Sequence, residues 1–535
     1  MEAESKELLP AMEPHMTVRP TPSCLLTAVI LWGGASIVCA DTLTDIRYND
    51  LVTRLGIANV PTGVGIGIGQ VEAPEGANYA PDTLAPYYAG TTFTLLNGAS
   101  ATSGHANTVA FNLCGDASSV APGLSNVWNY NANGWVGSSW LRVGQGSALP
   151  PLAAPATHCK VWNNSWIGSF GSTTNDNDGI RRLDWAMNRD GALAVSGTNN
   201  GAGSAAQPLM AYCFNGLTVG IASGGHSNGL TPTGIDGPNR RKPDLVAPGD
   251  FTSFSTPVVA SCAAMLFDEA NDHPNLATNA NASKGLTIKA AMLAGTTHRS
   301  SWSNGAPQSG VNRGSTATPL DALYGADLLN VDRAHRILTA GEQSGFATPQ
   351  ASSFSAGIGW DYVPTLVAAT SVYYTFHLSG VSSELSVTAS WNRLVASTFA
   401  SYTLLDCDLR LWKLEGSTLV SINGDAGATS FASGNCESNS LIDNAEHLYM
   451  KGVAPGDYVL QVSRKAGTQT TLPVCVAWYI DPSSLLGDLN GDGLVGPGDL
   501  SMLLNNWGAN GMGDLNGDAI VGAADLAILL GAWNS

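Results

Sequence analysis

Charged side chains are scarce in this 535-residue sequence. Asp, Glu, Lys and Arg together make up 12% of it, about half of the roughly 25% found in an average soluble protein. Cations are the scarcer sign, since 24 Lys and Arg face 42 Asp and Glu and leave a net charge of −18. Binding a phosphate backbone needs clustered cations, so this balance excludes nucleic acid as a partner. A hydrophobic content of 44%, with 14 Trp and 14 Tyr, also excludes a chain without a core.

Long apolar runs are also lacking, apart from one near the N-terminus. Cys24 to Ala40 is uninterrupted by charge, follows Arg19 and ends in the small residues Val38-Cys39-Ala40. This pattern predicts an export signal over residues 1–40, with translation starting at Met16, and hence a secreted, periplasmic or cell-surface protein. A membrane anchor or a buried strand is the alternative. No other segment is long and apolar enough to span a bilayer.

Cysteine pairs with metal-binding spacing are absent too. No two of the nine Cys form a C-x-x-C motif, which leaves no zinc site to propose. Cleavage of the signal removes Cys24 and Cys39 and leaves an odd number. Export permits disulfides, but the sequence does not decide how the remaining thiols pair.

The hydrophobic pattern divides the rest of the chain into three regions. Short apolar runs alternate with helical segments within 41–340, which predicts an α/β domain with a parallel sheet and functional residues at the strands' carboxyl ends. Within 345–482 the period becomes two, which indicates an antiparallel β-sandwich. Residues 486–535 hold a tandem repeat, GDLNGDGLVGPGDLSMLLNNWG and GDLNGDAIVGAADLAILLGAWN, that predicts a small α-helical module.

Four polar residues in the α/β region suit nucleophilic catalysis. Ser253 opens an apolar helix (TSFSTPVVASCAAML), where unpaired N–H groups stabilise negative charge. His105 lies in SGHANTVAF, and Glu72 ends the strand GVGIGIGQVE, where a carboxylate can orient an imidazole. Asn199 follows the strand GALAVSGT. Each also has an ordinary structural explanation: a helix cap, a solvated histidine, a strand-end carboxylate and an Asn-Gly turn.

The order of these residues resembles that of the subtilisin-like serine peptidases over about residues 60 to 300. The resemblance implies that Ser253 is the nucleophile, His105 the general base and Asn199 the oxyanion donor, while Glu72 stands where the family has Asp. Asp82 is the alternative acid. The resemblance therefore implies that the protein is a serine endopeptidase that acts on protein or peptide substrates without a catalytic cofactor. We expect it to be a monomer.

The chain departs from the family pattern at several points. Phe251 replaces a glycine before the serine, and Ala106 and Thr108 replace a glycine and a second histidine of the histidine segment. The alternative function is therefore a catalytically impaired subtilase-fold protein that binds or scaffolds. An unrelated α/β hydrolase is disfavoured because no Gly-x-Ser-x-Gly elbow surrounds Ser253. The segment VWNNSW, with Asn164, Ser165 and Trp166, is similar to the family's substrate-pairing strand.

The C-terminal repeat carries oxygen ligands at the spacing of calcium loops. Positions 1, 3, 5, 7 and 12 of each copy suit Ca²⁺, and they are occupied by Asp488, Asn490, Asp492, Leu494 and Asp499, and by Asp514, Asn516, Asp518, Ile520 and Asp525. A loop followed by one helix, twice in tandem, resembles a dockerin module, which implies a cohesin-like or cell-surface partner. The sandwich resembles P-domain or prepeptidase C-terminal modules, and Asp406, Asp408 and Glu446 are its candidate calcium ligands.

Overall fold

The computed structural model describes most of the chain after the predicted export signal. The described residues are 39–227, 229–467, 471–481, 487–489, 495–509, 513–516, 518 and 520–533. All but the last two residues of the predicted signal lie outside them. Among the described helices, none combines the length and the hydropathy that crossing a bilayer requires.

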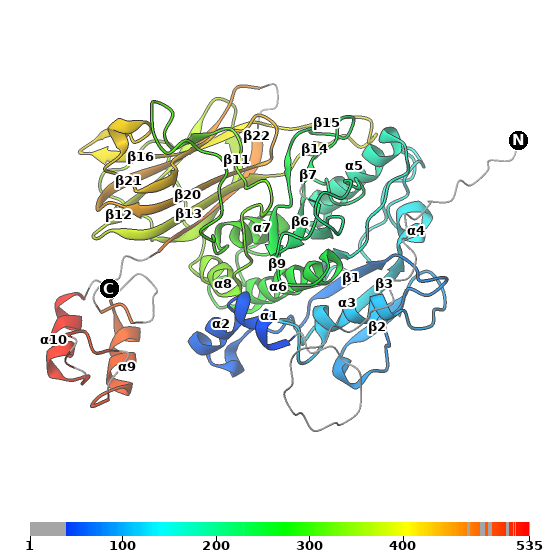
Figure 1. Cartoon of the computed structure of the whole chain (residues 1–535), viewed down its shortest axis with the longest axis horizontal. Coiled ribbons are helices and arrows are strands. Elements are labelled where there is room, and N and C mark those ends of the chain that lie inside the picture. The colour runs from blue at the N-terminus through cyan, green and yellow to red at the C-terminus, as the bar shows by residue number, and fades with distance from the viewer. Residues whose placement is uncertain are drawn as a thin grey trace, which may run out of the picture.

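The N-terminal half is built on a seven-stranded sheet, in the order β2-β3-β1-β4-β5-β6-β9 (Figure 1). Every neighbouring pair is parallel, which confirms the α/β prediction. Central strands β1, β5 and β6 are buried along their whole length, as parallel sheets between two helical layers are. The strands are β1 Gly67–Glu72, β2 Thr92–Leu95, β3 Asn126–Asn131, β4 Cys159–Asn164, β5 Leu193–Gly197, β6 Gly216–Ile221 and β9 Leu245–Ala247.

One face of this sheet is covered by the apolar helix α6, Thr252–Asp272, which contacts β4, β5, β6 and β9. Helix α3, Gly104–Cys114, lies beside α6, and α7, Gly285–Ala294, and α8, Val331–Thr339, complete this layer. The opposite face carries α5, Thr173–Asp190, and a cluster that includes Trp135, Trp140, Trp162 and Trp166. The carboxyl end of β1 meets the N-terminal turn of α3, which itself packs beside α6.

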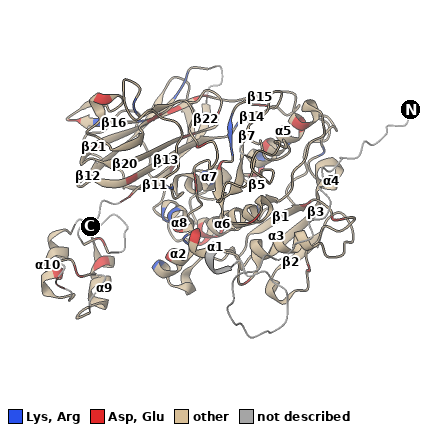
Figure 2. Ribbon diagram, viewed as in Figure 1, with Lys and Arg blue, Asp and Glu red and all other residues tan. Residues whose placement is uncertain are grey.

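Shorter elements connect these layers. They are α1 Cys39–Asp45, α2 Tyr48–Leu55, α4 Ala132–Gly134 with a π-helical turn at Trp135–Ser139, and the hairpin of β7 Gly229–Leu230 and β8 Arg241–Lys242. Charged residues are thinly distributed over the ribbon (Figure 2).

A β-rich region follows the α/β domain, as the change of period predicts. One sheet has the order β11-β22-β13-β20-β18 and the other β10-β19-β16-β21-β12, with β17 added on β16. The strands are β10 Ser315–Thr316, β11 Ile358–Val367, β12 Ser371–Leu378, β13 Ser382–Trp391, β16 Cys407–Glu415, β17 Thr418–Ser421, β18 Ser433–Asn435, β19 Glu437–Ser438, β20 Ala445–Val453, β21 Gly456–Arg464 and β22 Thr471–Ile480. The pair β14 Leu394–Val395 and β15 Tyr402–Thr403 lies apart from both sheets.

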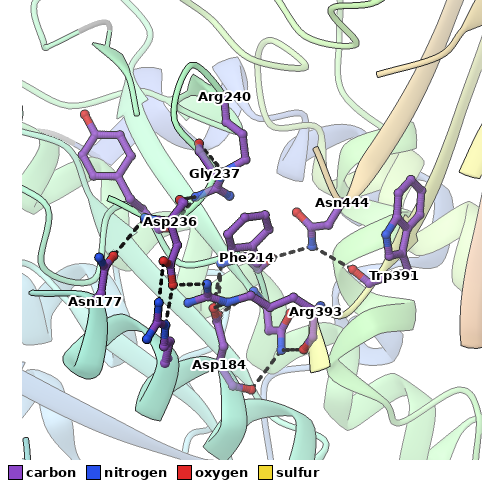
Figure 3. A network of polar contacts seen from close by, with 12 residues as sticks. Asn177, Asp184, Phe214, Asp236, Gly237, Arg240, Trp391, Arg393 and Asn444 are labelled. Carbon is purple, nitrogen blue, oxygen red and sulfur yellow. Dashed lines mark hydrogen bonds and ion pairs between the residues drawn. The ribbon is translucent and has the colours of Figure 1, made fainter. Parts of the chain in front are cut away.

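The sandwich is joined to the α/β domain by a buried polar network (Figure 3). The guanidinium of Arg393, which is fully buried, pairs with Asp184 of α5 and, at 2.8 Å, with Asp236. Asn444 donates to the carbonyls of Phe214, at 2.8 Å, and Trp391, at 2.7 Å. Separating the two domains would leave these buried charges without their partners, which costs free energy. The network therefore holds the sandwich and the α/β domain in one arrangement.

Two short helices end the described chain, α9 Pro497–Asn505 and α10 Ala523–Gly531. Their core is formed by Val495, Leu503, Val521 and Leu529, which are equivalent positions of the two repeats. The repeat thus packs against its own copy.

The seven cysteines outside the predicted signal are all buried and unpaired. Burial raises the pKa of the Cys114, Cys213 and Cys436 thiols to about 12, so these groups stay protonated near neutral pH. The described cysteines act as small apolar core residues, and the structure forms none of the disulfides that export would permit.

Candidate active site

Glu72 and His105 form a hydrogen-bonded pair at the carboxyl edge of the sheet. Glu72 is the last residue of β1 and is fully buried, while His105 is the second residue of α3. The helix begins there because the Ser103 hydroxyl accepts the Ala106 N–H at 3.1 Å, as a helix cap does. His105 Nδ1 lies 2.7 Å from Glu72 Oε2. Because an ionised carboxylate only accepts, Nδ1 carries the proton and Nε2 is left as the base.

The surroundings of His105 change how readily it ionises. Burial acts to lower the pKa of the imidazole, but the charge and hydrogen bond of Glu72, with a further contribution from Glu75, outweigh burial and raise it. Glu75 also accepts the Gly104 N–H at 2.9 Å. Asp82, the alternative acid, instead accepts the Leu84 N–H of its own loop at 3.2 Å. The structure therefore brings Glu72, and not Asp82, to the imidazole.

Ser253 lies in the first turn of α6, next to the helix that carries His105. The ring of Phe254, the following residue, is 5.8 Å from the imidazole ring, centroid to centroid. Within the described part of the chain, the Ser253 hydroxyl has no hydrogen-bond partner. Ser253 is the second residue of α6, so its hydroxyl lies at the N-terminal end of a long helix, where unpaired N–H groups carry partial positive charge.

The two asparagines that follow β5 have different partners. Asn199 Nδ2 donates to the Ala205 carbonyl at 2.9 Å, which uses the amide in its own loop. Asn200 Oδ1 accepts from the Thr252 N–H at 2.8 Å and from the Thr252 hydroxyl at 3.0 Å. The Asn200 amide is thereby anchored one residue from Ser253, with its NH₂ not used by any described residue. These contacts favour Asn200 over Asn199 as the amide beside the serine.

Sequence reasoning missed Asn200 and Glu75. Asn200 is adjacent to the chosen residue, and the turn after β5 decides which of the two amides faces α6. One feature of the sequence could have indicated Glu75, namely its position in the loop that directly follows the strand ending at Glu72.

The residues predicted to line a substrate strand are buried. Asn163 Nδ2 donates to the Ser165 hydroxyl at 3.0 Å, and Trp166 Nε1 donates to Asn164 Oδ1 at 3.2 Å. These bonds order the carboxyl end of β4. Pairing of this segment with a substrate stays a prediction.

Three carboxylates of the second C-terminal loop converge. One oxygen from each of Asp514, Asp518 and Asp525 lies within 4.8 Å of the others. Asp525 Oδ1 accepts the N–H groups of Leu515, at 2.8 Å, and Asn516, at 3.0 Å, and Oδ2 accepts that of Gly522, at 2.7 Å. Although burial acts to raise the pKa of Asp525, these bonds outweigh it and lower the pKa. Hard oxygen donors that stay ionised fit a calcium ion.

In the first loop only part of the proposed ligand set is described. Asp499 accepts the N–H groups of Leu489, at 2.7 Å, and Gly496, at 2.8 Å, which matches the bonds of Asp525. Asn490, Asp492 and Leu494 lie outside the described residues.

Two of the three sandwich carboxylates have other partners. Asp408 pairs with Lys465, and Glu446 accepts the Ser438 hydroxyl and, at 2.7 Å, the Ser440 N–H. Among the described residues, Asp406, Asp408 and Glu446 do not form a three-carboxylate group.

Comparison with known proteins adds little to this geometry. No protein-family model matches the chain, and no curated protein does. Two similar solved structures are the serine protease of Aeromonas sobria and the complex of that protease with its chaperone. Each is 13% identical with a TM-score of 0.33, and the match covers 78% of this chain and 88% of the other. Similarity this low does not define the function of this chain.

Replacing Glu72 by Gln is expected to lower the pKa of His105, because the carboxylate charge that favours the imidazolium is lost. With the carboxylate present, the raised pKa means that the pair adds stability below about pH 6.5, and that this stability is lost as pH rises through the folded-state pKa. NMR titration of the His105 ring measures the shift, with Glu75→Gln as a control of smaller effect. An unchanged pKa in Glu72→Gln would show that the pair does not form in solution.

Proposed function

We propose that this protein is a serine endopeptidase of the subtilisin-like type. The proposal is carried by one observation, the 2.7 Å hydrogen bond from His105 to a buried Glu72, with His105 on a helix that packs beside α6 and α6 carrying Ser253 in its first turn. A carboxylate, an imidazole and a hydroxyl in this order form a nucleophilic triad.

The proposed reaction uses each of these groups in turn. His105 Nε2 takes the proton of the Ser253 hydroxyl as Oγ attacks the peptide carbonyl carbon, and the resulting imidazolium is stabilised by Glu72. The negative charge on the carbonyl oxygen is stabilised by the Asn200 NH₂ and the N-terminus of α6. His105 then protonates the leaving amine, and the acyl-enzyme is hydrolysed by water through the same steps.

The main departure from the family pattern is compatible with this chemistry. Phe251 has φ −136° and ψ 153°, an extended conformation that any residue adopts, so the turn before Ser253 does not require glycine. Loss of activity through this substitution is therefore not expected. If the unaltered protein neither reacts with a fluorophosphonate probe nor hydrolyses casein, the alternative function, a non-enzymatic binding or scaffold protein, is favoured.

Ser253→Ala is expected to abolish labelling by a fluorophosphonate probe and hydrolysis of casein, with the thermal transition unchanged. Ser255→Ala is the matched control, because Ser255 lies two residues along the same helix, and its buried hydroxyl faces the Phe251 carbonyl at 3.4 Å. The control should keep both activities. Labelling that survives in Ser253→Ala, or is absent in the unaltered protein, contradicts the proposal.

The two asparagines give a second comparison. Asn200→Ala is expected to lower kcat by about 10²–10³-fold, which is the typical effect of removing one oxyanion-hole donor, as in subtilisin. Asn199→Ala should change kcat by less than about threefold, since the Asn199 amide serves its own loop. Steady-state hydrolysis of a peptide substrate measures both. The opposite ranking would return the role to Asn199.

We also propose that the C-terminal repeat binds Ca²⁺, on the evidence of the converging Asp514, Asp518 and Asp525. When bound, the ion would offset two of the three carboxylate charges and link the loop to α10 through Asp525. Export of the chain, and a cohesin-like or cell-surface partner for the repeat, stay predictions.

Calcium is expected to raise the helical circular dichroism of the full chain, with reversal by EGTA. Isothermal titration of Ser253→Ala, which avoids autolysis, should show that Asp525→Asn removes one equivalent of bound calcium. Asp50→Asn, a change of an exposed acid on α2, is the control and should remove none. Equal stoichiometry in the two variants would exclude the ligand assignment.

A further inference from the structure

Three amide side chains lie side by side in the core of the α/β domain. Gln70 of β1 is in register with Asn129 of β3 on one side and with Asn163 of β4 on the other, and all three are fully buried. They lie on the α6 face, because the residues two positions earlier in each strand, Ile68, Val127 and Val161, belong to the core cluster that contains α6. Amides in such a place cost stability unless they are hydrogen-bonded.

Gln70 is the amide of this row that reaches the catalytic pair. Its Nε2 donates to Glu72 Oε1 at 3.1 Å and to the Ala106 carbonyl at 2.9 Å. One NH₂ group thus connects the acid to the residue that follows His105 in α3. The two Glu72 oxygens are then held by different donors, Oε1 by Gln70 and Oε2 by His105.

The other two amides do not contact Glu72. Asn163 donates to Ser165, and neither polar atom of the Asn129 side chain has a partner among the described residues. Asn129 is therefore a neighbour of equal burial and similar chemistry that lacks the proposed role.

We propose that Gln70 is a positioning residue for the Glu72 carboxylate. A glutamate has one more side-chain torsion than an aspartate, so the longer acid needs a second contact to hold one orientation toward the imidazole. The Gln70 N–H also stabilises the carboxylate charge when the imidazole is neutral, which is the state in which His105 acts as base. This inference rests on the proposed function.

The test compares Gln70→Met, which keeps the length of the side chain but removes the N–H donor, with Asn129→Leu. In Gln70→Met, kcat should fall by about 10- to 100-fold with KM within about twofold, because the loss is one of orientation. The acid limb of the pH–rate profile should move upward by about one unit, because the pair holds its proton more tightly once the donor is lost. Asn129→Leu should leave kcat and this limb unchanged.

NMR titration of His105 in the Ser253→Ala background gives a readout that does not need activity. There, adding Gln70→Met should raise the His105 pKa, and adding Asn129→Leu should not. An unchanged pKa with an unchanged kcat overturns the proposal, as does an equal fall of kcat in both variants with no movement of the limb. A shifted pKa in a protein that neither hydrolyses peptide nor reacts with the probe would keep the positioning role and remove the proposed function instead.

Discussion

The buried carboxylate of Glu72 is the constraint on which the rest of the site depends. A carboxylate without exposure to water costs much free energy unless donors surround it. Two side chains supply them, Gln70 from its own strand and His105 from α3. Because those donors come from separate elements, the charge is tolerated only when β1 and α3 meet as they do in the folded chain.

Helix α6 serves both packing and the site. Alanine, valine and serine make up half of its buried residues, and such small side chains let the helix lie close against β4, β5 and β6. The same packing sets α6, with Ser253 in its first turn, beside α3, whose second residue is His105. The core that stabilises the domain thus also sets the place of the candidate nucleophile.

The sandwich is part of this arrangement. Trp360, Cys475, Ala477 and Tyr479 of its strands belong to the same core cluster as helices α7 and α8. Arg393 adds buried ion pairs to Asp184 and Asp236 across the contact (Figure 3). Removing the sandwich would expose apolar surface and leave charges unpaired, so we interpret it as a structural support for the α/β domain.

The hydrophobic pattern alone predicted that a parallel sheet comes first in the chain and antiparallel sheets follow. Its period reflects the local geometry of helices and strands, so it can be recognised without the tertiary structure. Glu72 and His105 were selected through the resemblance to subtilisin-like peptidases, and the structure places the two side chains within hydrogen-bond distance. Only the tertiary structure showed that Asn199 bonds within its own loop while Asn200 contacts Thr252 of α6, the difference on which our proposal of Asn200 rests. The tertiary structure alone showed that Gln70 donates to Glu72 and that the seven described cysteines are unpaired. Both findings depend on which elements pack together and not on a pattern within one element.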